Sequence, residues 1–296
     1  MTSRLETARL LREHARTFAL TLRLLPRDLC EPLGIAYLLA RISDTIADVA
    51  KIPRERRLAL LEDLKASLAA GDFGSWRPRV EAGDVSPREG ELIEAFPGLI
   101  HALEGAPDRE RILSLWRTIL EGQLFDLRRF GSFVPEALPL TRGELEHYCG
   151  LVAGSVGEFW TRLIAAHAPD RLVRPVAEMI PLGIAYGKGL QLVNILRDRA
   201  EDRALGRCYA GEEDLLGLFD LAAGWLADGG RYLSRLHPGR ILMATALPHD
   251  LAVRTLAAIR RSPETPRVSM SRGSVRLVLL RNVTSLCFPR GCNPAS

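Results

Sequence analysis

The sequence predicts an all-α protein built as one large helical bundle. Apolar residues recur at three- and four-residue spacing through most of the 296 residues, and 47% of the chain is hydrophobic. Helix-start signals accompany this period, and no linker is long or polar enough to separate two hydrophobic cores. Six segments carry the helical period most clearly: Thr7–Leu25, Leu29–Val49, Arg54–Ala69, Arg109–Phe130, Glu144–Ala166 and Arg174–Arg199.

Local signals mark where several of these helices begin. Ser86 with Glu89, and Thr141 with Glu144, fit the capping box, in which two side chains satisfy backbone amides at the start of a helix. Pro53 suits a first helical turn because its fixed backbone angle is already helical. A weak alternating run at Val268–Leu280 is the one candidate strand.

The composition argues against several classes of protein. The five cysteines are scattered and include no Cys-x-x-Cys pair, which disfavours a disulfide framework and a zinc site. The longest apolar stretches, near Gly34–Ala40 and Leu277–Leu280, fall short of the ~20 residues that span a bilayer. We therefore expect a soluble, cytoplasmic protein. Arginines after Leu251 make the C-terminal part basic, which favours contact with phosphate or an anionic membrane surface.

The most informative segment is the helix that ends near residue 48. Tyr37, Arg41, Asp44 and Asp48 lie above one another on a single face of that helix. Two aspartates four residues apart repel each other, and a divalent cation removes that penalty. Mg²⁺ prefers one or two carboxylates together with phosphate oxygens. A solvated polar stripe is the alternative, and this motif alone does not exclude it.

A second helix repeats the pattern, which favours a metal-binding site over a solvated polar stripe. Its polar face contains Gln191, Asn194, Asp198 and either Glu201 or Asp202. Two such helices facing each other would bracket Mg²⁺ ions and hold a diphosphate between them. Diphosphate can leave an allylic carbon only if its developing charge is stabilised. Three arginines could neutralise the leaving phosphates: Arg41, Arg197 and Arg207.

A third segment is rich in glycine. Gly150, Gly154 and Gly157 are expected on one face of a helix that also contains Tyr148. Each glycine inside a helix costs ~1 kcal/mol relative to alanine, so three together need a reason. Close helix packing and room for a bulky apolar substrate are the two explanations.

These motifs, in this order, resemble the squalene/phytoene synthase family. The resemblance runs from about Arg16 to about Leu280. Its marks are Arg16-Thr17-Phe18, Asp44-Thr-Ile-Ala-Asp48, Tyr148-Cys-x-x-Val-Ala-Gly-x-x-Gly157 and Gln191-x-x-Asn194-Ile-Leu-Arg197-Asp198-x-x-Glu201-Asp202, followed by Gly206-Arg207. It implies an isoprenoid-synthase bundle with a central cavity over residues 1–285. The tail over residues 286–296, which contains Pro289-Arg-Gly-Cys-Asn-Pro, is expected to be disordered.

The resemblance also implies roles for individual residues. The expected ligands of Mg²⁺ are Asp44, Asp48, Asp198, Glu201 and Asp202. The expected diphosphate and substrate contacts are Arg16, Tyr37, Arg41, Gln191, Asn194, Arg197 and Arg207. Tyr148 matches the tyrosine to which the family assigns proton handling or carbocation control.

The implied reaction joins two farnesyl diphosphates into presqualene diphosphate, which the squalene-forming members reduce with hydride from NADPH. Asp44-Thr45-Ile46, Ala246-Leu247-Pro248 and Arg267–Arg272 look most like those members. No Rossmann or Walker motif is present, so NADPH would bind within the bundle cavity. We expect a monomer with a peripheral membrane contact for product release.

Other interpretations remain open at this point. Within the family they are a phytoene synthase and a dehydrosqualene- or hydroxysqualene-forming enzyme without NADPH. A terpene cyclase or head-to-tail prenyl synthase usually has adjacent aspartates, and a non-catalytic scaffold would have lost them. Glu144-x-x-His147 matches half of a ferritin-like metal site, which needs two such motifs. No basic patch with interleaved aromatic residues supports nucleic-acid binding.

Overall fold

The computed structural model describes residues 4–14, 21–22, 24–49, 51–74, 76, 78, 80–81, 83–130 and 138–261. Within these ranges the chain forms helices and no strand, which confirms the all-α prediction. The candidate strand at Val268–Leu280, the resemblance mark around Arg16 and the tail over residues 286–296 lie outside the described residues.

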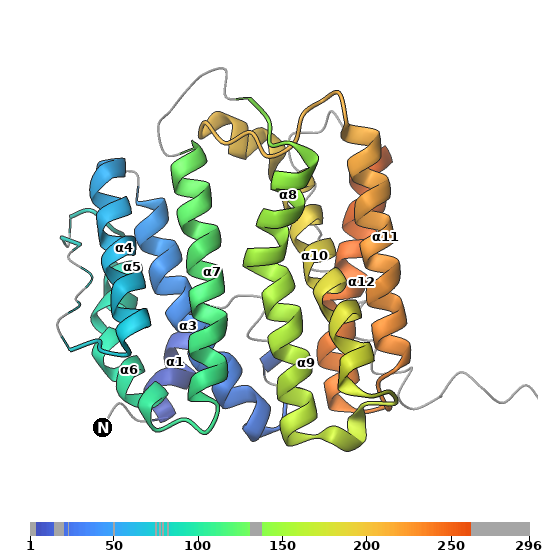
Figure 1. Cartoon of the computed structure of the whole chain (residues 1–296), viewed down its shortest axis with the longest axis horizontal. Helices are drawn as coiled ribbons and strands as arrows, with labels where there is room; N and C mark the ends of the chain where they lie inside the picture. Colours follow the sequence, from blue (N-terminus) through green and yellow to red (C-terminus); the bar gives the residue numbers. More distant parts are fainter. Residues whose placement is uncertain are drawn as a thin grey trace, which may run out of the picture.

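The helices follow one another in a simple up-and-down order (Figure 1). The elements are α1 (Arg4–His14), α3 (Arg27–Asp48), α4 (Arg54–Ala70), α5 (Pro87–Glu94), α6 (Phe96–Glu104), α7 (Arg109–Phe130), α8 (Arg142–Cys149), a π-helical segment (Gly150–Gly154), α9 (Ser155–His167), α10 (Val176–Ala204), α11 (Leu215–Ser234) and α12 (Arg240–Arg261).

Both predicted capping boxes are present. At Ser86 and at Thr141 the side chain accepts from the amide three residues on, and the glutamate there accepts from the capping residue's own amide. Glu144 is therefore occupied in starting α8, and it is not half of a ferritin-like metal pair. The predicted helix over Glu144–Ala166 is interrupted by the π-helical segment, whose wider turn shifts the register of the residues that follow.

Two layers of apolar side chains fill the bundle. One group lies among α1, α3, α4, α6, α7 and α9 and includes Trp116 and Phe96, both at most 1% exposed. The other lies among α8, α10, α11 and α12, and it also includes the end of α7 and the loop at residues 208–210. Figure 1 shows α3 to α6 on the left and α10 to α12 on the right, with α7 beside the column formed by α8 and α9.

Glycines let α9 and α10 approach closely. A Cβ placed on Gly157 would lie 1.9 Å from the carbonyl oxygen of Gly183, and one on Gly187 would lie 2.0 Å from that of Ala153. A Cβ on Gly150 would meet nothing within 4 Å. The three predicted glycines therefore do not share one contact face, because the π turn rotates Gly150 away from the face that Gly157 presents.

One helix in the described part of the chain, α10, is long and apolar enough to cross a membrane by length and composition. Half of its apolar window is buried inside the bundle, where it packs against α9, α11 and α12. Its last turns carry Asp198 and Asp202. We therefore interpret it as the central core helix, which explains its apolar composition without a membrane.

Candidate active site

Carboxylates gather where three helices end. Asp48 is the last residue of α3, Asp126 lies one turn before the end of α7, and Asp202 lies in the last turn of α10. The carbonyl end of a helix carries partial negative charge, so these aspartates stand where an anion is least stable. The arrangement therefore calls for cations between the helices.

Arg207 supplies one such cation. Its guanidinium donates to Asp48 Oδ1 at 2.5 Å, and its Nε lies 3.9 Å from Asp126 Oδ2. Gly206, with φ +78°, takes the left-handed conformation that ends α10 and turns the chain back towards α3 and α7. Arg207 thus joins three helices by its charge.

The electrostatics of the cluster reflect this crowding of negative charge. Burial, followed by repulsion from Asp48, raises the pKa of Asp44 to about 6. Burial also raises the pKa of Asp202 to about 6, although Arg207 opposes that shift. Burial lowers the pKa of Arg207, but Asp48 and Asp126 more than offset this, so the pKa of Arg207 is raised. The Asp44 side chain remains 38% exposed, so water screens part of the repulsion.

Two further arginines pair with aspartates of their own helices. Arg41 pairs with Asp44 on α3. Arg197 donates to both carboxylate oxygens of Asp198 on α10, from Nε at 2.8 Å and from Nη2 at 2.5 Å. The predicted arginines therefore lie among the predicted carboxylates. Arg197 binds both oxygens of its carboxylate, and a phosphate offers a guanidinium group the same bidentate geometry.

The donor set fits Mg²⁺ with a diphosphate. Over the described residues, no three carboxylate, histidine or cysteine groups converge closely enough to hold an ion by themselves. Mg²⁺ does not need such a cage, because it keeps waters and takes one or two carboxylates together with substrate phosphates. The raised pKa values of Asp44 and Asp202 identify carboxylates whose negative charge a metal ion would relieve.

Aromatic rings close one side of the cluster. The Tyr148 ring stacks on Tyr209, with centroids 5.2 Å apart, and on Phe125, with centroids 6.1 Å apart. The Tyr209 hydroxyl donates to Asp126. Burial, followed by the charge of Asp126, raises the pKa of Tyr148 well above its ordinary value, so this phenol keeps its proton at neutral pH.

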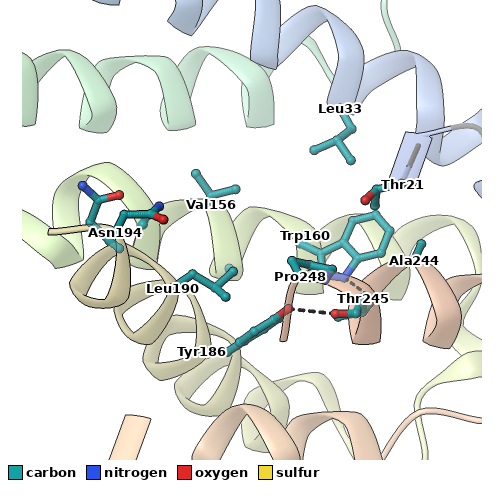
Figure 2. A pocket seen from close by; sticks show the side chains of 14 residues that line it. Thr21, Leu33, Val156, Trp160, Tyr186, Leu190, Asn194, Ala244, Thr245 and Pro248 are labelled. Atoms are coloured by element: carbon teal, nitrogen blue, oxygen red, sulfur yellow. Dashed lines mark hydrogen bonds between the residues drawn. The ribbon is translucent and has the colours of Figure 1, made fainter. Parts of the chain in front are cut away.

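The bundle contains an apolar cavity of about 260 Å³, and Figure 2 shows side chains that line it. Gln191 and Asn194 line it, and they share one polar face of α10 with Asp198. Deeper in, its wall includes Val156, Trp160 and Leu190. Trp160 donates to Thr245 Oγ1 at 3.1 Å, and Tyr186 donates to the Thr245 carbonyl at 2.7 Å, so the polar atoms at this end are satisfied within the wall.

The structure places most of the predicted site residues at this cluster or beside it. Tyr37 uses its hydroxyl to donate to the His14 carbonyl, which ties α3 to α1. Glu201 is an exposed residue on the last turns of α10. Arg16 lies outside the described residues. Gly157 fits both explanations of the glycine-rich segment, close helix packing and room for a substrate. It packs against α10 and also lines the cavity.

Sequence reasoning missed Asp126 and Tyr209. Asp126 is a lone aspartate on an otherwise ordinary amphipathic helix, and only the fold brings it to Arg207. Tyr209 is two residues after Arg207, and this closeness in sequence to a predicted phosphate contact is the signal that indicates a place near the site.

The sequence of this chain is similar to those of several known enzymes. A squalene synthase of Gibberella zeae is 25% identical over 313 residues, which cover 95% of this chain and 65% of that protein. A presqualene diphosphate synthase of Rhodopseudomonas palustris is 31% identical over 198 residues, covering 67% of this chain and 58% of that protein. The chain thus spans less than two thirds of the length of either relative.

The fold and the family agree with each other. The solved structure of TcSQS with the ligand BPH1237 matches with a TM-score of 0.75 at 20% identity, covering 98% of this chain and 92% of that one. The family model described as squalene/phytoene synthase matches residues 11–219, which contain the carboxylates of α3, α7 and α10 as well as Tyr148 and Arg207. The chain belongs to the squalene/phytoene synthase family.

Proposed function

We propose that this protein is a Mg²⁺-dependent squalene synthase that joins two farnesyl diphosphates head to head. The observation that carries the proposal is one juxtaposition. Aspartates from α3, α7 and α10 surround Arg207, and the apolar cavity begins at Gln191 and Asn194 on the same face of α10 as Asp198. A diphosphate head and a prenyl tail need these two environments side by side.

The residues of the chain divide the work of the first step. Asp44, Asp48, Asp198 and Asp202 would hold Mg²⁺, which supplies charge stabilisation to the departing diphosphate. Arg41, Arg197 and Arg207 would bind the phosphate oxygens as they gain charge. The allylic C–O bond breaks with its electron pair going to diphosphate, and the double bond of the second substrate attacks the cation.

The new cyclopropane forms when the product cation loses a proton. Tyr148 lies beside the carboxylate cluster, near Asp126, and its pKa is raised well above the ordinary value. A neutral phenol there can orient the diphosphate or the proton acceptor without adding negative charge. The apolar wall near Trp160 offers water no hydrogen-bond partners, and in this proposal it would keep water away from the carbocation.

Reduction of presqualene diphosphate to squalene by NADPH is the second half of the proposal, and it rests on the family resemblance. The lining of the cavity is largely apolar, with Gln191, Asn194 and Thr245 among its polar members, and none of the described residues that line it carries a basic side chain that would pair with the phosphates of a dinucleotide. The relative from Rhodopseudomonas palustris favours a second candidate, a presqualene diphosphate synthase that stops after the first step.

The test is an incubation of the protein with farnesyl diphosphate and Mg²⁺, with and without NADPH, followed by mass spectrometry of the extracted products. Squalene that forms only with NADPH supports the full proposal. Presqualene diphosphate under both conditions supports the second candidate, and dehydrosqualene or hydroxysqualene indicates another family product. Phytoene from geranylgeranyl diphosphate indicates a different chain length. No product from either substrate indicates a non-catalytic scaffold.

A further inference from the structure

Tyr209 takes no part in the reaction steps proposed above, yet its side chain is held by burial, a hydrogen bond and stacking with other rings. Tyr209 is only 6% exposed, and its hydroxyl donates to Asp126 on α7. Its ring lies nearly parallel to that of Tyr148, with 5.2 Å between the centroids and 17° between the planes. Phe130 packs its edge against the same ring at 5.1 Å.

The loop that carries Tyr209 is fastened at several points. The Arg207 amide donates to the Asp202 carbonyl at 2.8 Å, and the Leu140 amide donates to the Cys208 carbonyl at 3.1 Å. The loop is thus tied to the end of α10 on one side and to the segment before α8 on the other. Because α8 carries Tyr148, the Tyr209 ring is fixed relative to the ring on which it stacks.

Asp126 links this aromatic pair to the polar cluster. One of its oxygens accepts from Tyr209, while the other faces Arg207 at 3.9 Å. A purely packing aromatic residue would need no hydroxyl at this place. The phenol instead uses a carboxylate of the site as its anchor, so the same aspartate fixes both Arg207 and Tyr209.

We propose that Tyr209 is a positioning residue for Tyr148. Asp126 fixes the Tyr209 hydroxyl, and the Tyr209 ring in turn sets the plane in which the Tyr148 phenol meets the substrate. Tyr148 also stacks on Phe125, but Phe125 has no polar group through which it could be anchored to the cluster. This inference rests on the proposed function, since it assigns Tyr148 a part in the first condensation step.

Substitutions at Tyr209, with a control at Tyr232, test the inference through activity. Tyr209→Phe keeps the stacked ring and removes the anchoring hydroxyl, while Tyr209→Leu removes both. The matched control is Tyr232→Phe. Tyr232 is a fully buried tyrosine outside the carboxylate cluster, and its hydroxyl accepts from Thr161 at 3.1 Å. Misplacement of a reacting group by ~1 Å can lower a rate by up to ~10²-fold, which sets the scale of the effect.

We expect Tyr209→Phe to lower kcat about tenfold while KM changes less than about threefold, and Tyr209→Leu to lower kcat further. The control should keep its kcat within about twofold. Near-UV circular dichroism gives a readout that does not depend on activity. The spectral changes of Tyr209→Phe and Tyr148→Phe should not add in the double variant, because one ring sets the geometry of the other.

The inference is overturned if kcat of Tyr209→Phe falls no more than that of Tyr232→Phe, or if KM rises while kcat is unchanged. Additive near-UV spectra would also overturn it, since they would show two rings that do not influence each other. If the unmodified protein makes no product from farnesyl diphosphate, the proposed function fails instead. The spectra then still decide whether Tyr209 fixes Tyr148.

Discussion

Arg207 and Asp48 are 159 positions apart in the chain, yet the guanidinium of one donates to the carboxylate of the other at 2.5 Å. This pair joins the loop after α10 to the end of α3. It lies among Asp126 and Asp202 as well, so the single cation offsets several negative charges. Arg207 therefore offsets the negative charge of the carboxylate cluster, and in the proposed function it would also bind phosphate.

The first prediction concerns the stability of the metal-free protein. Arg207→Gln should lower the Tm in a chelating buffer by about 4–10 °C, because partly buried carboxylates lose their counter-charge. Mg²⁺ should restore part of that loss in the variant. Differential scanning calorimetry with and without Mg²⁺ measures both effects.

Arg231→Gln is the matched control. Arg231 pairs with Asp228 along α11 and is 64% exposed, so its removal should shift the Tm by less than about 2 °C. Equal shifts in the two variants would show that the carboxylate cluster gains nothing special from Arg207.

The second prediction is that Asp48→Asn loses activity while the fold survives. Asp48 is 47% exposed, so its neutral amide replacement removes little packing. Product formation should fall by at least about 10²-fold, because a ligand for the departing diphosphate's counter-ion is lost. Mass spectrometry of products and far-UV circular dichroism check the two halves of the prediction. Asp220→Asn, at an exposed pair with Arg260, is the control. Near-wild-type turnover in Asp48→Asn would remove Asp48 from the site.

The third prediction is that Tyr148→Phe stops the reaction before presqualene diphosphate. The ring and its stacking on Tyr209 and Phe125 remain, so only the hydroxyl is tested. The intermediate should be absent from extracts made without NADPH. Unchanged accumulation of presqualene diphosphate would show that Tyr148 only packs there.

The fourth prediction is a pH dependence with a defined sign. The pKa values of Asp44 and Asp202 are raised in the folded protein to about 6 from 3.8. Between pH about 6 and 3.8, the folded state therefore binds protons that the unfolded chain does not bind. As pH falls through this range, these two groups raise the free energy of unfolding. Their cost to stability is full above pH about 6.

Asp202→Asn isolates this effect from other titrating groups. Its Tm should exceed that of the unmodified protein by about 2–4 °C near pH 8, and the difference should shrink towards zero near pH 4. Activity should fall as pH drops through about 6, because protonated carboxylates bind cations poorly. A Tm difference that grows towards low pH would contradict the assignment.

The sequence predicts the helices and both carboxylate pairs because these depend on local spacing. The i, i+4 aspartates on α3 and α10 belong to one helix face each, and a face can be derived from the helical period alone. Capping at Ser86 and Thr141 is equally local, since it involves residues three positions apart.

The rest of the site depends on contacts between distant segments. Asp126 has no second carboxylate at helical spacing, and Tyr209 lies in a loop whose path is set by the left-handed Gly206. The π turn at Gly150–Gly154 also escapes prediction, because its sequence is compatible with an ordinary helix. Its extra residue decides which glycines meet α10, and only packing between the two helices reveals that.

The last prediction uses these glycines to separate packing from empty space. Gly157→Ala would place a Cβ 1.9 Å from the Gly183 carbonyl oxygen, and backbone atoms cannot move away by changing rotamer. The cost of overpacking, about 1–3 kcal/mol, should exceed the ~1 kcal/mol that alanine gains in a helix. Gly150→Ala meets nothing within 4 Å and should keep or raise the Tm. Thermal unfolding of the two variants side by side tests this difference. A Tm for Gly157→Ala equal to that of Gly150→Ala would mean that α9 and α10 can separate freely, and that close packing does not explain the glycine at 157.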